Sequence, residues 1–372
     1  MSTNSPTRVV IAMSGGVDSS VAAALLKEQG YDVTGLMMHL WSEPGHAGEN
    51  RCCTKDAMST ARGIAGQLGI PFYSVDARQV FHDTVVKYFI NGYTQGTTPN
   101  PCLMCNRLIR WEFLLKQALA LGADFMATGH YARLRAVDGQ SLTTNHGALP
   151  NVGERVELLR GVDKHKDQSY VLHILNQEQL SHTLFPLGEY TKSQVRALAR
   201  KFDLPVAERA DSQDLCFVGA GSYQDFLLRN APQVEKPGPI LNTDSEQLGQ
   251  HRGLAFYTIG QRRGLGIAAP YPLYVRRKDI VNNALIIDRK ENLGRDELSA
   301  QDTNWIAGEA PNAPIRAQVK IRYKARLVWG RITPLENKHI HIKFETSIRD
   351  ITPGQAAVFY DGDVCLGGGI IE

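Results

Sequence analysis

Hydrophobic and polar positions alternate with two different periods along the chain, and the longer period fills the first 130 residues. Short apolar runs at 9–13, 33–38, 72–75 and 124–128 are typical of buried strands. Amphipathic segments between them predict helices at 21–29, 54–68, from about 79, and 111–121. This alternation predicts an α/β fold with a doubly wound parallel sheet, whose ligands bind beyond the carboxyl ends of the strands.

The shorter period appears in the second half. A last amphipathic helix is expected at 191–202, with Thr191 as its N-cap. Pro237-Gly238-Pro239 predicts a linker, and 249–288 combine Gly, Arg and short alternating stretches, which indicates a small β-rich module. From about 290 the period is two, and Asp361-Gly362 signals a hairpin, so a small antiparallel β-barrel is predicted. We therefore expect three domains, at 1–226, 227–289 and 290–372.

Composition is that of a globular protein. Of 372 residues, 43% are hydrophobic and 21% are charged, and the formal net charge is +3. The sequence has no apolar run of about 18 residues, and its first residues are polar and unlike a signal peptide. We therefore expect no membrane association and a cytoplasmic location. Basic residues crowd the second half, which favours a phosphate-rich partner.

The turn after the first strand, Ser14-Gly15-Gly16-Val17-Asp18-Ser19, suits phosphate binding. Its glycines allow several backbone N–H groups to point into one concavity, and the next helix adds its positive end. Ser-Gly-Gly alone would equally suit an ordinary turn. The loop lacks the lysine of a P-loop. It resembles the pyrophosphate loop of enzymes that split ATP into AMP and pyrophosphate to adenylate an oxygen. That resemblance implies that Asp18, Ser14 and Ser19 help to hold pyrophosphate and its magnesium.

Six cysteines in a chain without an export signal argue against a disulfide scaffold. Asn100-Pro101-Cys102-Leu103-Met104-Cys105 delivers two thiols toward a helix start, where a thiol pKa falls. Three interpretations compete: a structural zinc site, which lacks a second ligand pair; a redox pair, which lacks its usual flanks; and a catalytic thiol with a distant partner. Cys216, in Asp-Ser-Gln-Asp-Leu-Cys-Phe, is the candidate partner, although a small buried hydrophobe would look similar.

Other chemically suggestive residues have simpler interpretations. Lys166, Asp167 and Gln168 suit phosphates and base edges, but a polar helix start has the same pattern. His339 and His341 are expected to be exposed polar positions rather than metal ligands. Cys52 and Cys53 follow His46, but adjacent thiols make poor zinc geometry and a loop is expected there. Cys365 is expected in the core.

The motifs taken together resemble the bacterial tRNA-specific 2-thiouridylase family. They are S-G-G-V-D-S-S, P-N-P-C-L-M-C-N, T-G-H-Y, K-D-Q-S-Y, D-S-Q-D-L-C-F, T-I-G-Q-R-R-G-L-G and G-G-G-I-I, in this order from about residue 8 onward. The resemblance implies an adenine nucleotide alpha hydrolase-like first domain that uses ATP and Mg²⁺. It also implies replacement of the C2 oxygen of the wobble uridine by sulfur, with the tRNA anticodon loop and a sulfur donor, a cysteine desulfurase or relay protein, as partners.

The resemblance also implies roles for particular residues. ATP would be held by Ala12, Met13, Ser14, Gly15, Gly16, Val17, Asp18, Ser19, Met38 and Gly129. The target base would be framed by Asn100, Pro101 and Cys102. Contacts with tRNA or base discrimination would come from His130, Lys166, Asp167, Gln168, Arg322, Tyr323 and Gln355. Cys216 would carry the persulfide sulfur and Cys105 would be its catalytic partner.

The chemistry of the residues agrees with these roles. Adenylation turns the C2 oxygen into part of AMP, a good leaving group, and persulfide sulfur from Cys216 then attacks C2. Either Cys105 attacks the persulfide, frees sulfide and leaves a disulfide for an external reductant, or the terminal sulfur attacks directly and Cys105 resolves afterwards. Both routes need the base turned out of its loop.

One departure from the family opens another route. Some members have an acidic residue where this chain has Cys102, so that Cys102, Cys105 and Cys216 form a possible three-thiol ligand set for an iron–sulfur cluster that delivers sulfur. Two further hypotheses stay open. One is a synthetase or amidotransferase with the same loop and a nitrogen nucleophile, and the other is a non-catalytic RNA-binding protein with a redox-sensitive thiol pair.

Overall fold

The computed structural model describes residues 6–45, 54–142, 149–150, 153–210, 215–219 and 221–372. Its N-terminal unit is built on a five-stranded parallel sheet in the order β3-β2-β1-β4-β8. The strands are β1 (Arg8–Ala12), β2 (Asp32–His39), β3 (Phe72–Asp76), β4 (Phe125–Ala127) and β8 (Thr183–Leu184). Four of them were predicted from apolar runs, and the α/β fold class is confirmed.

Helices cover both faces of this sheet. Val9 and Ile11 of β1 pack in one apolar cluster with α1 (Val17–Glu28), α2 (Lys55–Gln67) and α9 (Lys192–Lys201). Val10, between them in the sequence, packs instead in the cluster of Trp111 and Leu114. Successive side chains of a strand point to opposite faces, so a strand buried on both sides is apolar throughout. The predicted N-cap Thr191 is confirmed, since it forms a capping box with Gln194.

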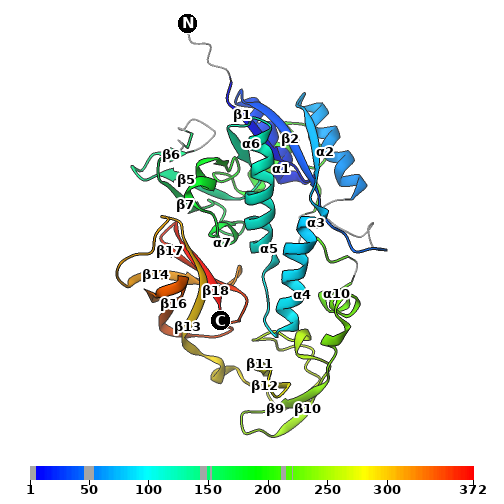
Figure 1. The fold of residues 1–372 in the computed structure, drawn as a ribbon, viewed down its shortest axis with the longest axis vertical. Helices are drawn as coiled ribbons and strands as arrows, with labels where there is room; N and C mark the ends of the chain where they lie inside the picture. Colours follow the sequence, from blue (N-terminus) through cyan, green and yellow to red (C-terminus); the bar gives the residue numbers. More distant parts are fainter. Residues whose placement is uncertain (1–5, 46–53, 143–148, 151–152, 211–214, 220) are drawn as a thin grey trace.

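The helix predicted at 111–121 begins ten residues earlier. It runs from α5 (Pro101–Met104) through the π-helical η3 (Cys105–Leu114) to α6 (Leu115–Ala120). Asn100 caps it by accepting from Cys102 N at 3.1 Å, and Pro101 takes the first helical position, which proline favours. A second long helix lies beside it, formed by α3 (Arg78–Phe81), η2 (His82–Val86) and α4 (Lys87–Thr94) (Figure 1).

The central module contains a four-stranded sheet in the order β10-β9-β12-β11. Its strands are β9 (Gly238–Leu241), β10 (Gln247–His251), β11 (Leu273–Asp279) and β12 (Ala284–Arg289), and α10 (Tyr223–Asn230) and η4 (Pro232–Val234) lead into it. The predicted linker at 237–239 is wrong, because Gly238 and Pro239 belong to β9 and pair with His251 and Gln250. Short 3-10 turns, η5 (Leu254–Phe256) and η6 (Lys290–Leu293), complete the module.

The C-terminal unit is the predicted barrel. Strands β13 (Arg295–Trp305), β16 (Ile340–Ile348), β15 (Val328–Pro334), β14 (Ile315–Lys320), β17 (Ala356–Asp361) and β18 (Val364–Ile371) follow one another around it, with η7 (Glu336–Lys338) before β16. Pairing of β13 with β18 closes it. The hairpin at Asp361-Gly362 is confirmed. His339 and His341 contact Glu372 and Glu297 at the surface, as their pattern indicated.

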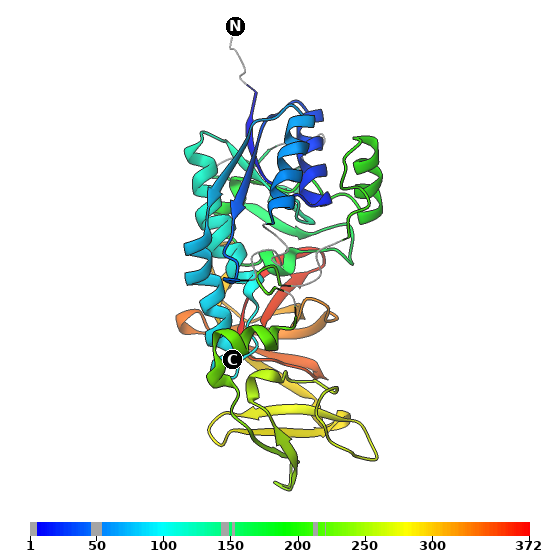
Figure 2. The same ribbon diagram turned by 90° about the vertical axis from the view of Figure 1, so that its right-hand side faces the viewer.

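The barrel sheet continues into the N-terminal unit, which the sequence did not indicate. Val364 and Cys365 of β18 pair with Leu159 and Leu158 of β7 (Val156–Arg160). Beyond β7 follow β5 (Ala132–Ala136) and β6 (Ser141–Leu142), and the short helices α7 (Ser169–Leu172) and α8 (Gln177–Ser181) lie next in the chain. The parallel sheet and the central module lie at opposite ends of the molecule, with the barrel between them (Figures 1 and 2). Within the described residues, no helix is both long enough and apolar enough for a membrane span.

Candidate active site

The predicted phosphate loop joins β1 to α1 at the carboxyl end of the sheet. Gly15 has a φ of +70°, and a Cβ there would lie 2.5 Å from the carbonyl oxygen of Ala57 at the start of α2, so only glycine fits. Ser19 Oγ accepts from Ser14 N at 3.2 Å and donates to Gly16 O at 3.2 Å. The hydroxyls of Ser14 and Ser19 are 3.2 Å apart. The loop is therefore closed on itself by the two serines expected at pyrophosphate.

The other residues expected at ATP lie around this loop. Met38 is near the end of β2, which neighbours β1 on one side, and Gly129 follows β4, which neighbours it on the other. A Cβ on Gly129 would meet Ser19 N at 2.8 Å, so the chain after β4 passes directly against the first turn of α1. The structure thus brings together all the residues expected at ATP, from the carboxyl ends of three adjacent strands.

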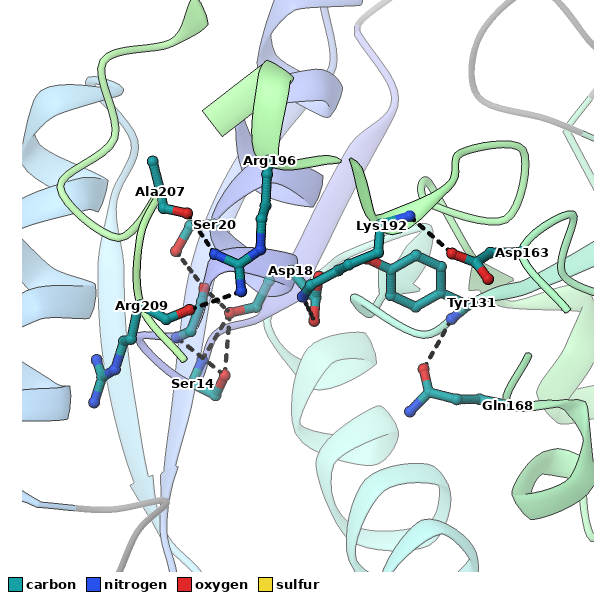
Figure 3. A network of polar contacts seen from close by, with 12 residues as sticks. Ser14, Asp18, Ser20, Tyr131, Asp163, Gln168, Lys192, Arg196, Ala207 and Arg209 are labelled. Atoms are coloured by element: carbon teal, nitrogen blue, oxygen red, sulfur yellow. Dashed lines mark hydrogen bonds and ion pairs between the residues drawn. The ribbon is translucent and has the colours of Figure 1, made fainter. Parts of the chain in front are cut away.

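Asp18 is the charged centre of the loop and has two partners from distant segments. Lys192 Nζ lies 2.7 and 2.9 Å from its two carboxylate oxygens, and Tyr131 OH donates to Oδ1 at 2.7 Å. Figure 3 shows the carboxylate between these two side chains. Lys192 is the first residue of α9, and its backbone N–H donates to Asp163 Oδ2 at 2.9 Å. The side chain of Asp18 is 34% exposed and that of Lys192 only 12%, so the open side of the ion pair is the carboxylate.

Two arginines connect the loop to the segment that follows α9. Arg209 donates to the carbonyl oxygen of Gly15 at 2.7 Å. Arg196 of α9 donates to the carbonyl oxygens of Ala207 and Arg209 at 2.6 and 3.0 Å (Figure 3). These bonds hold the segment after α9 against the phosphate loop.

A single carboxylate suits the magnesium expected here. Mg²⁺ in nucleotide sites is typically held by one or two carboxylates together with substrate phosphates. Asp18 supplies one such carboxylate, and ATP would supply the other oxygens. Among the residues that the structure describes, no group of three or more His, Cys, Asp or Glu side chains is placed to hold a metal ion. Cys102, Cys105 and Cys216 all lie in the described part, so the structure gives no support to the three-thiol cluster.

The two thiols expected in catalysis share one apolar cluster. Cys105 is buried at the start of η3, and Cys216, partly buried, packs against the same cluster. Met38 of β2 packs against the same cluster. Cys102 is exposed, one helical turn before Cys105. The acidic flank of Cys216 at 211–214 and the predicted loop of His46, Cys52 and Cys53 lie outside the described residues.

His130, directly after Gly129, is a neutral imidazole. Its Nδ1 lies 2.7 Å from Thr128 Oγ1, and its Nε2 lies 3.4 Å from Arg110 Nη1. Burial, with a further contribution from the charge of Arg110, lowers the pKa of His130 well below its ordinary value. A neutral imidazole can accept a hydrogen bond at one nitrogen and donate at the other.

The residues expected at tRNA divide into two sets. Asp167 is buried and accepts from Gly161 N and Ser169 N at 3.2 and 3.1 Å, while Gln168 Oε1 accepts from Tyr131 N at 2.9 Å. Lys166 is partly buried at the surface of the same turn. Asp167 and Gln168 therefore use their side chains within the protein, and Gln168 positions the tyrosine that contacts Asp18.

The second set lies where the barrel meets the other units. Arg322 donates to the carbonyl oxygen of Ile259 at 2.8 Å and to Thr352 Oγ1. Burial lowers its pKa. Gln355 Nε2 donates to the carbonyl oxygen of Thr98 at 2.8 Å, two residues before Asn100. Tyr323 packs edge-on against Tyr170. Arg322 and Gln355 thus tie the barrel to the central module and to the Asn100 loop.

Comparison with known proteins shows which family the chain belongs to. Residues 7–220 match the family described as "tRNA methyl transferase HUP domain", 224–289 the "tRNA methyl transferase PRC-barrel domain" and 295–371 the "Aminomethyltransferase beta-barrel domain". The tRNA-specific 2-thiouridylase MnmA of Roseiflexus castenholzii is 47% identical over 367 residues, which cover 98% of this chain and 99% of that protein. The chain belongs to the tRNA-specific 2-thiouridylase family. The resemblance seen in the sequence motifs is confirmed.

A second 2-thiouridylase is similar over the same length. The tRNA-specific 2-thiouridylase MnmA of Moorella thermoacetica is 48% identical over 366 residues, which cover 98% of this chain and 99% of its own. Among solved structures, a 4-thiouridine synthetase–RNA complex with bound ATP is 14% identical and covers 61% of this chain and 51% of that chain, with a TM-score of 0.35. A TM-score this low bears on neither fold nor function.

Motif reasoning missed the residues that surround Asp18. Tyr131 is part of the quoted T-G-H-Y motif, but nothing in the sequence linked it to Asp18, which is 113 positions away. Lys192 stands 174 positions from Asp18, at the start of a helix whose pattern gave only its amphipathic face. Arg209 had no sequence signal at all. The Lys192 contact is made only when α9 packs beside α1, and the Tyr131 contact only when the chain after β4 passes the start of α1.

Proposed function

We propose that the protein is an ATP-dependent sulfurtransferase that converts the wobble uridine of tRNA to 2-thiouridine, with AMP and pyrophosphate as the other products. One observation supports this most strongly. The phosphate loop follows β1, and Met38 on the neighbouring strand packs in the cluster that holds both Cys105 and Cys216. An adenylation site, and beside it an apolar cluster that contains a pair of thiols, are the two parts that the reaction needs.

In this proposal the loop activates the oxygen that leaves. Ala12 to Ser19, Met38 and Gly129 hold ATP, with pyrophosphate against the loop N–H groups and the start of α1. Asp18 would be the protein ligand of Mg²⁺, which would neutralise charge on the phosphates. Lys192 remains beside the carboxylate and adds positive charge near the departing pyrophosphate. Uridine attacks the α-phosphorus through its C2 oxygen, and pyrophosphate leaves.

The thiols then deliver sulfur. A sulfur donor protein, a desulfurase or relay protein, loads Cys216 as a persulfide. In one route the Cys105 thiolate attacks the sulfur of Cys216, which releases hydrosulfide and forms a Cys105–Cys216 disulfide. Hydrosulfide displaces AMP from C2, and an external dithiol reduces the disulfide. In the other route the terminal persulfide sulfur attacks C2 and AMP leaves. The Cys105 thiolate then attacks the sulfur of Cys216, which breaks the S–S bond, leaves the terminal sulfur on the base and forms the same disulfide.

The target uridine turns out of the anticodon loop into this site. Asn100, Pro101 and Cys102 frame the base, and the neutral imidazole of His130 takes part in its discrimination. Lys166, Asp167, Gln168, Arg322, Tyr323 and Gln355 contribute to tRNA recognition, with Asp167 and Gln168 acting through the turn that they hold. In this proposal residues 1–226 form the adenylation domain, 227–289 a central β-rich domain that contacts tRNA, and 290–372 the C-terminal β-barrel domain, in a cytoplasmic protein.

Sulfur transfer explains the residues better than the alternatives. The family description mentions methyl transfer, but methyl transfer requires no adenylated oxygen and gives the phosphate loop no role. A nitrogen nucleophile would leave Cys105 and Cys216 without a function. A non-catalytic RNA-binding protein would need neither Asp18 nor its two partners.

The test is nucleoside mass spectrometry of unmodified tRNA after incubation with ATP, magnesium, cysteine and a cysteine desulfurase. Wild type, Cys102→Ser, Cys105→Ser and Cys216→Ser are compared, and iron is measured in each anaerobically purified protein. We expect 2-thiouridine from iron-free wild type and from Cys102→Ser, and none from the other two variants. Activity that requires iron and all three thiols would favour the cluster instead. AMP formation without any thiolation would contradict the proposal.

A further inference from the structure

A cavity lies where the three units meet, away from the phosphate loop. Its volume is about 240 Å³, several times the roughly 30 Å³ that one water takes in the liquid. The N-terminal unit contributes Thr98, the central module contributes Ile259 and Lys278, and the barrel contributes Asp350 and Thr352. We call it the junction cavity. Among the charged residues of the lining, the basic ones from β11 and Arg295 of β13 outnumber the single acid, Asp350.

Lys278 is the unusual residue of this wall. It lies on β11, and its Nζ is buried without a hydrogen-bond partner among the described residues. Burial lowers the pKa of Lys278 to about 8. Its two neighbours differ, because Arg276 contacts Asp288 at 2.6 Å and Arg277 contacts Asp279 at 3.2 Å. A buried ammonium is costly unless a counter-charge or hydrogen-bond acceptors are supplied.

Two more polar atoms, on residues that line the same cavity, are buried and have no hydrogen-bond partner among the described residues. They are Thr98 Oγ1 and Asp350 Oδ1. Native proteins leave few such atoms, and each calls for an explanation. The set offers donors on Lys278 and Thr98 and an acceptor on Asp350. A ligand that satisfies all three must accept at one end and donate at the other.

We propose that the junction cavity binds a phosphate group, held by Lys278 and Thr98. The unprotonated phosphate oxygens accept from the ammonium and the hydroxyl. Asp350 accepts from a hydroxyl beside the phosphorus, which is the P–OH of hydrogen phosphate or the 2′-hydroxyl of an RNA nucleotide. The chemistry of the site is the same for free phosphate and for an RNA backbone. Only the RNA source rests on the proposed function.

Because of where the cavity lies, an RNA phosphate bound in it would affect the segment that leads to the target base. Thr98 N donates to Pro353 O at 2.8 Å, and Gln355 donates to Thr98 O, so the Thr98 segment is already fastened to the barrel. Thr98 also leads directly to Asn100 and Pro101, which are proposed to frame the base. A phosphate bound between Lys278 and Thr98 would fix the central module against that segment as RNA docks.

The first arm of the test uses inorganic phosphate and the full-length protein in phosphate-free buffer. Isothermal titration compares wild type, Lys278→Met and the control Lys290→Met, which removes an exposed lysine of η6, directly after β12. We expect saturable binding to wild type and Lys290→Met, and none to Lys278→Met. The thermal midpoint of Lys278→Met should equal or exceed that of wild type, which shows that the variant is folded. Equal binding to all three proteins, or no binding and no RNA effect, would overturn the proposal.

The second arm separates the two sources. The affinity of an unmodified anticodon stem-loop is measured from low to high salt for the same three proteins. If the site takes an RNA phosphate, Lys278→Met lowers the slope of log K against log salt by about 0.7 to 0.9 and Lys290→Met leaves it unchanged. If it takes free phosphate, the slopes agree while phosphate binding is still lost. A protein that binds no tRNA would contradict the proposed function, but the phosphate titration would still decide the cavity.

Discussion

The phosphate loop and the junction cavity each bury a lysine, and only one of these lysines has a carboxylate beside it. Lys192 lies 2.7 Å from Asp18, and the pair is stabilised within the protein. Lys278 has a buried Nζ and no partner among the described residues. Both positions desolvate an ammonium, which costs several kcal/mol when nothing offsets it. The difference indicates that the first site keeps its charge balanced before a ligand binds, and that the second is balanced by the ligand itself.

A balanced site and an unbalanced site respond differently to mutation. When one partner of a buried ion pair is removed, the other charge stays buried and nothing offsets its desolvation free energy. Removing an unpartnered charge relieves that cost. The predictions below test this contrast, from the largest expected effect to the smallest.

Asp18→Asn should reduce tRNA-dependent pyrophosphate release by about 10²- to 10³-fold, the loss typical of a group that stabilises transition-state charge. The amide cannot hold Mg²⁺ as a carboxylate does, and it removes the ion pair with Lys192. The rate is measured by coupled pyrophosphate assay at saturating ATP. Asp56→Asn, an exposed acid in the first turn of α2, is the control and should keep the wild-type rate. A wild-type rate in Asp18→Asn would contradict the role given to the loop.

Lys278→Met should raise the free energy of unfolding by about 3 kcal/mol at pH 7, because its pKa of about 8 lies below the 10.5 of an exposed lysine. The unfolded chain binds the extra proton between these values, so wild type gains stability as the pH rises from about 8 to 10.5. The advantage of the variant should therefore shrink across that window. Urea unfolding in phosphate-free buffer measures it, with Lys290→Met as control. An advantage that stays constant with pH would show that Lys278 is not buried as a charge.

Tyr131→Phe should lower kcat/KM for ATP by about tenfold. The change removes one hydrogen bond to a carboxylate, which typically contributes about 1.5 to 3 kcal/mol, although solvent reaches Asp18 and offsets part of the loss. Steady-state pyrophosphate release gives the value. Tyr170→Phe makes the same chemical change at a buried tyrosine that donates to Ala356 O, and should leave kcat/KM unchanged. Equal losses in the two variants would point to a packing effect.

Gln355→Leu should weaken tRNA binding by about fivefold, as expected for one neutral hydrogen bond of about 1 kcal/mol. The lost bond to Thr98 O fastens the barrel to the segment before Asn100. Filter binding at fixed salt measures the affinity, and ATP hydrolysis without tRNA should not change. Gln301→Leu, on the exposed surface of β13, is the control. If both variants bind tRNA like wild type, the Thr98 contact does not position the RNA.

The parts of the fold that local chemistry determines were predictable. The apolar runs of β1 and β2, the capping box of α9 and the period-two strands of the barrel all depend on neighbours within a few residues. The prediction of a linker at 237–239 was wrong because β9 contains Pro239, and proline is uncommon within a strand. The helix start at Pro101 was missed because Pro99 and Pro101, on either side of Asn100, favour an irregular loop, although Asn100 is a standard cap.

The candidate site divides in the same way. Ser14 to Ser19 form one continuous motif, so their shared loop could be predicted from the sequence. Tyr131 and Lys192 reach Asp18 only through tertiary packing, and Lys278 becomes unusual only when three units enclose it. A single sequence without related sequences contains no signal for such long-range pairings. The assignments of Cys105 and Cys216 stay predictions, supported by their common apolar cluster.

The pairing of β7 with β18 has a consequence for how the chain is made. Strand β7 reaches its partner only after about 200 further residues have been synthesised, because Leu159 pairs with Val364. At ribosomal rates of about 5 to 20 residues per second, that wait lasts about 10 to 40 s. During it, one edge of β7 presents unpaired N–H and C=O groups, the kind of edge that promotes aggregation. The nascent chain is therefore most prone to aggregate before β18 has been synthesised. Slow translation of residues 160–364 should lower the yield of soluble protein.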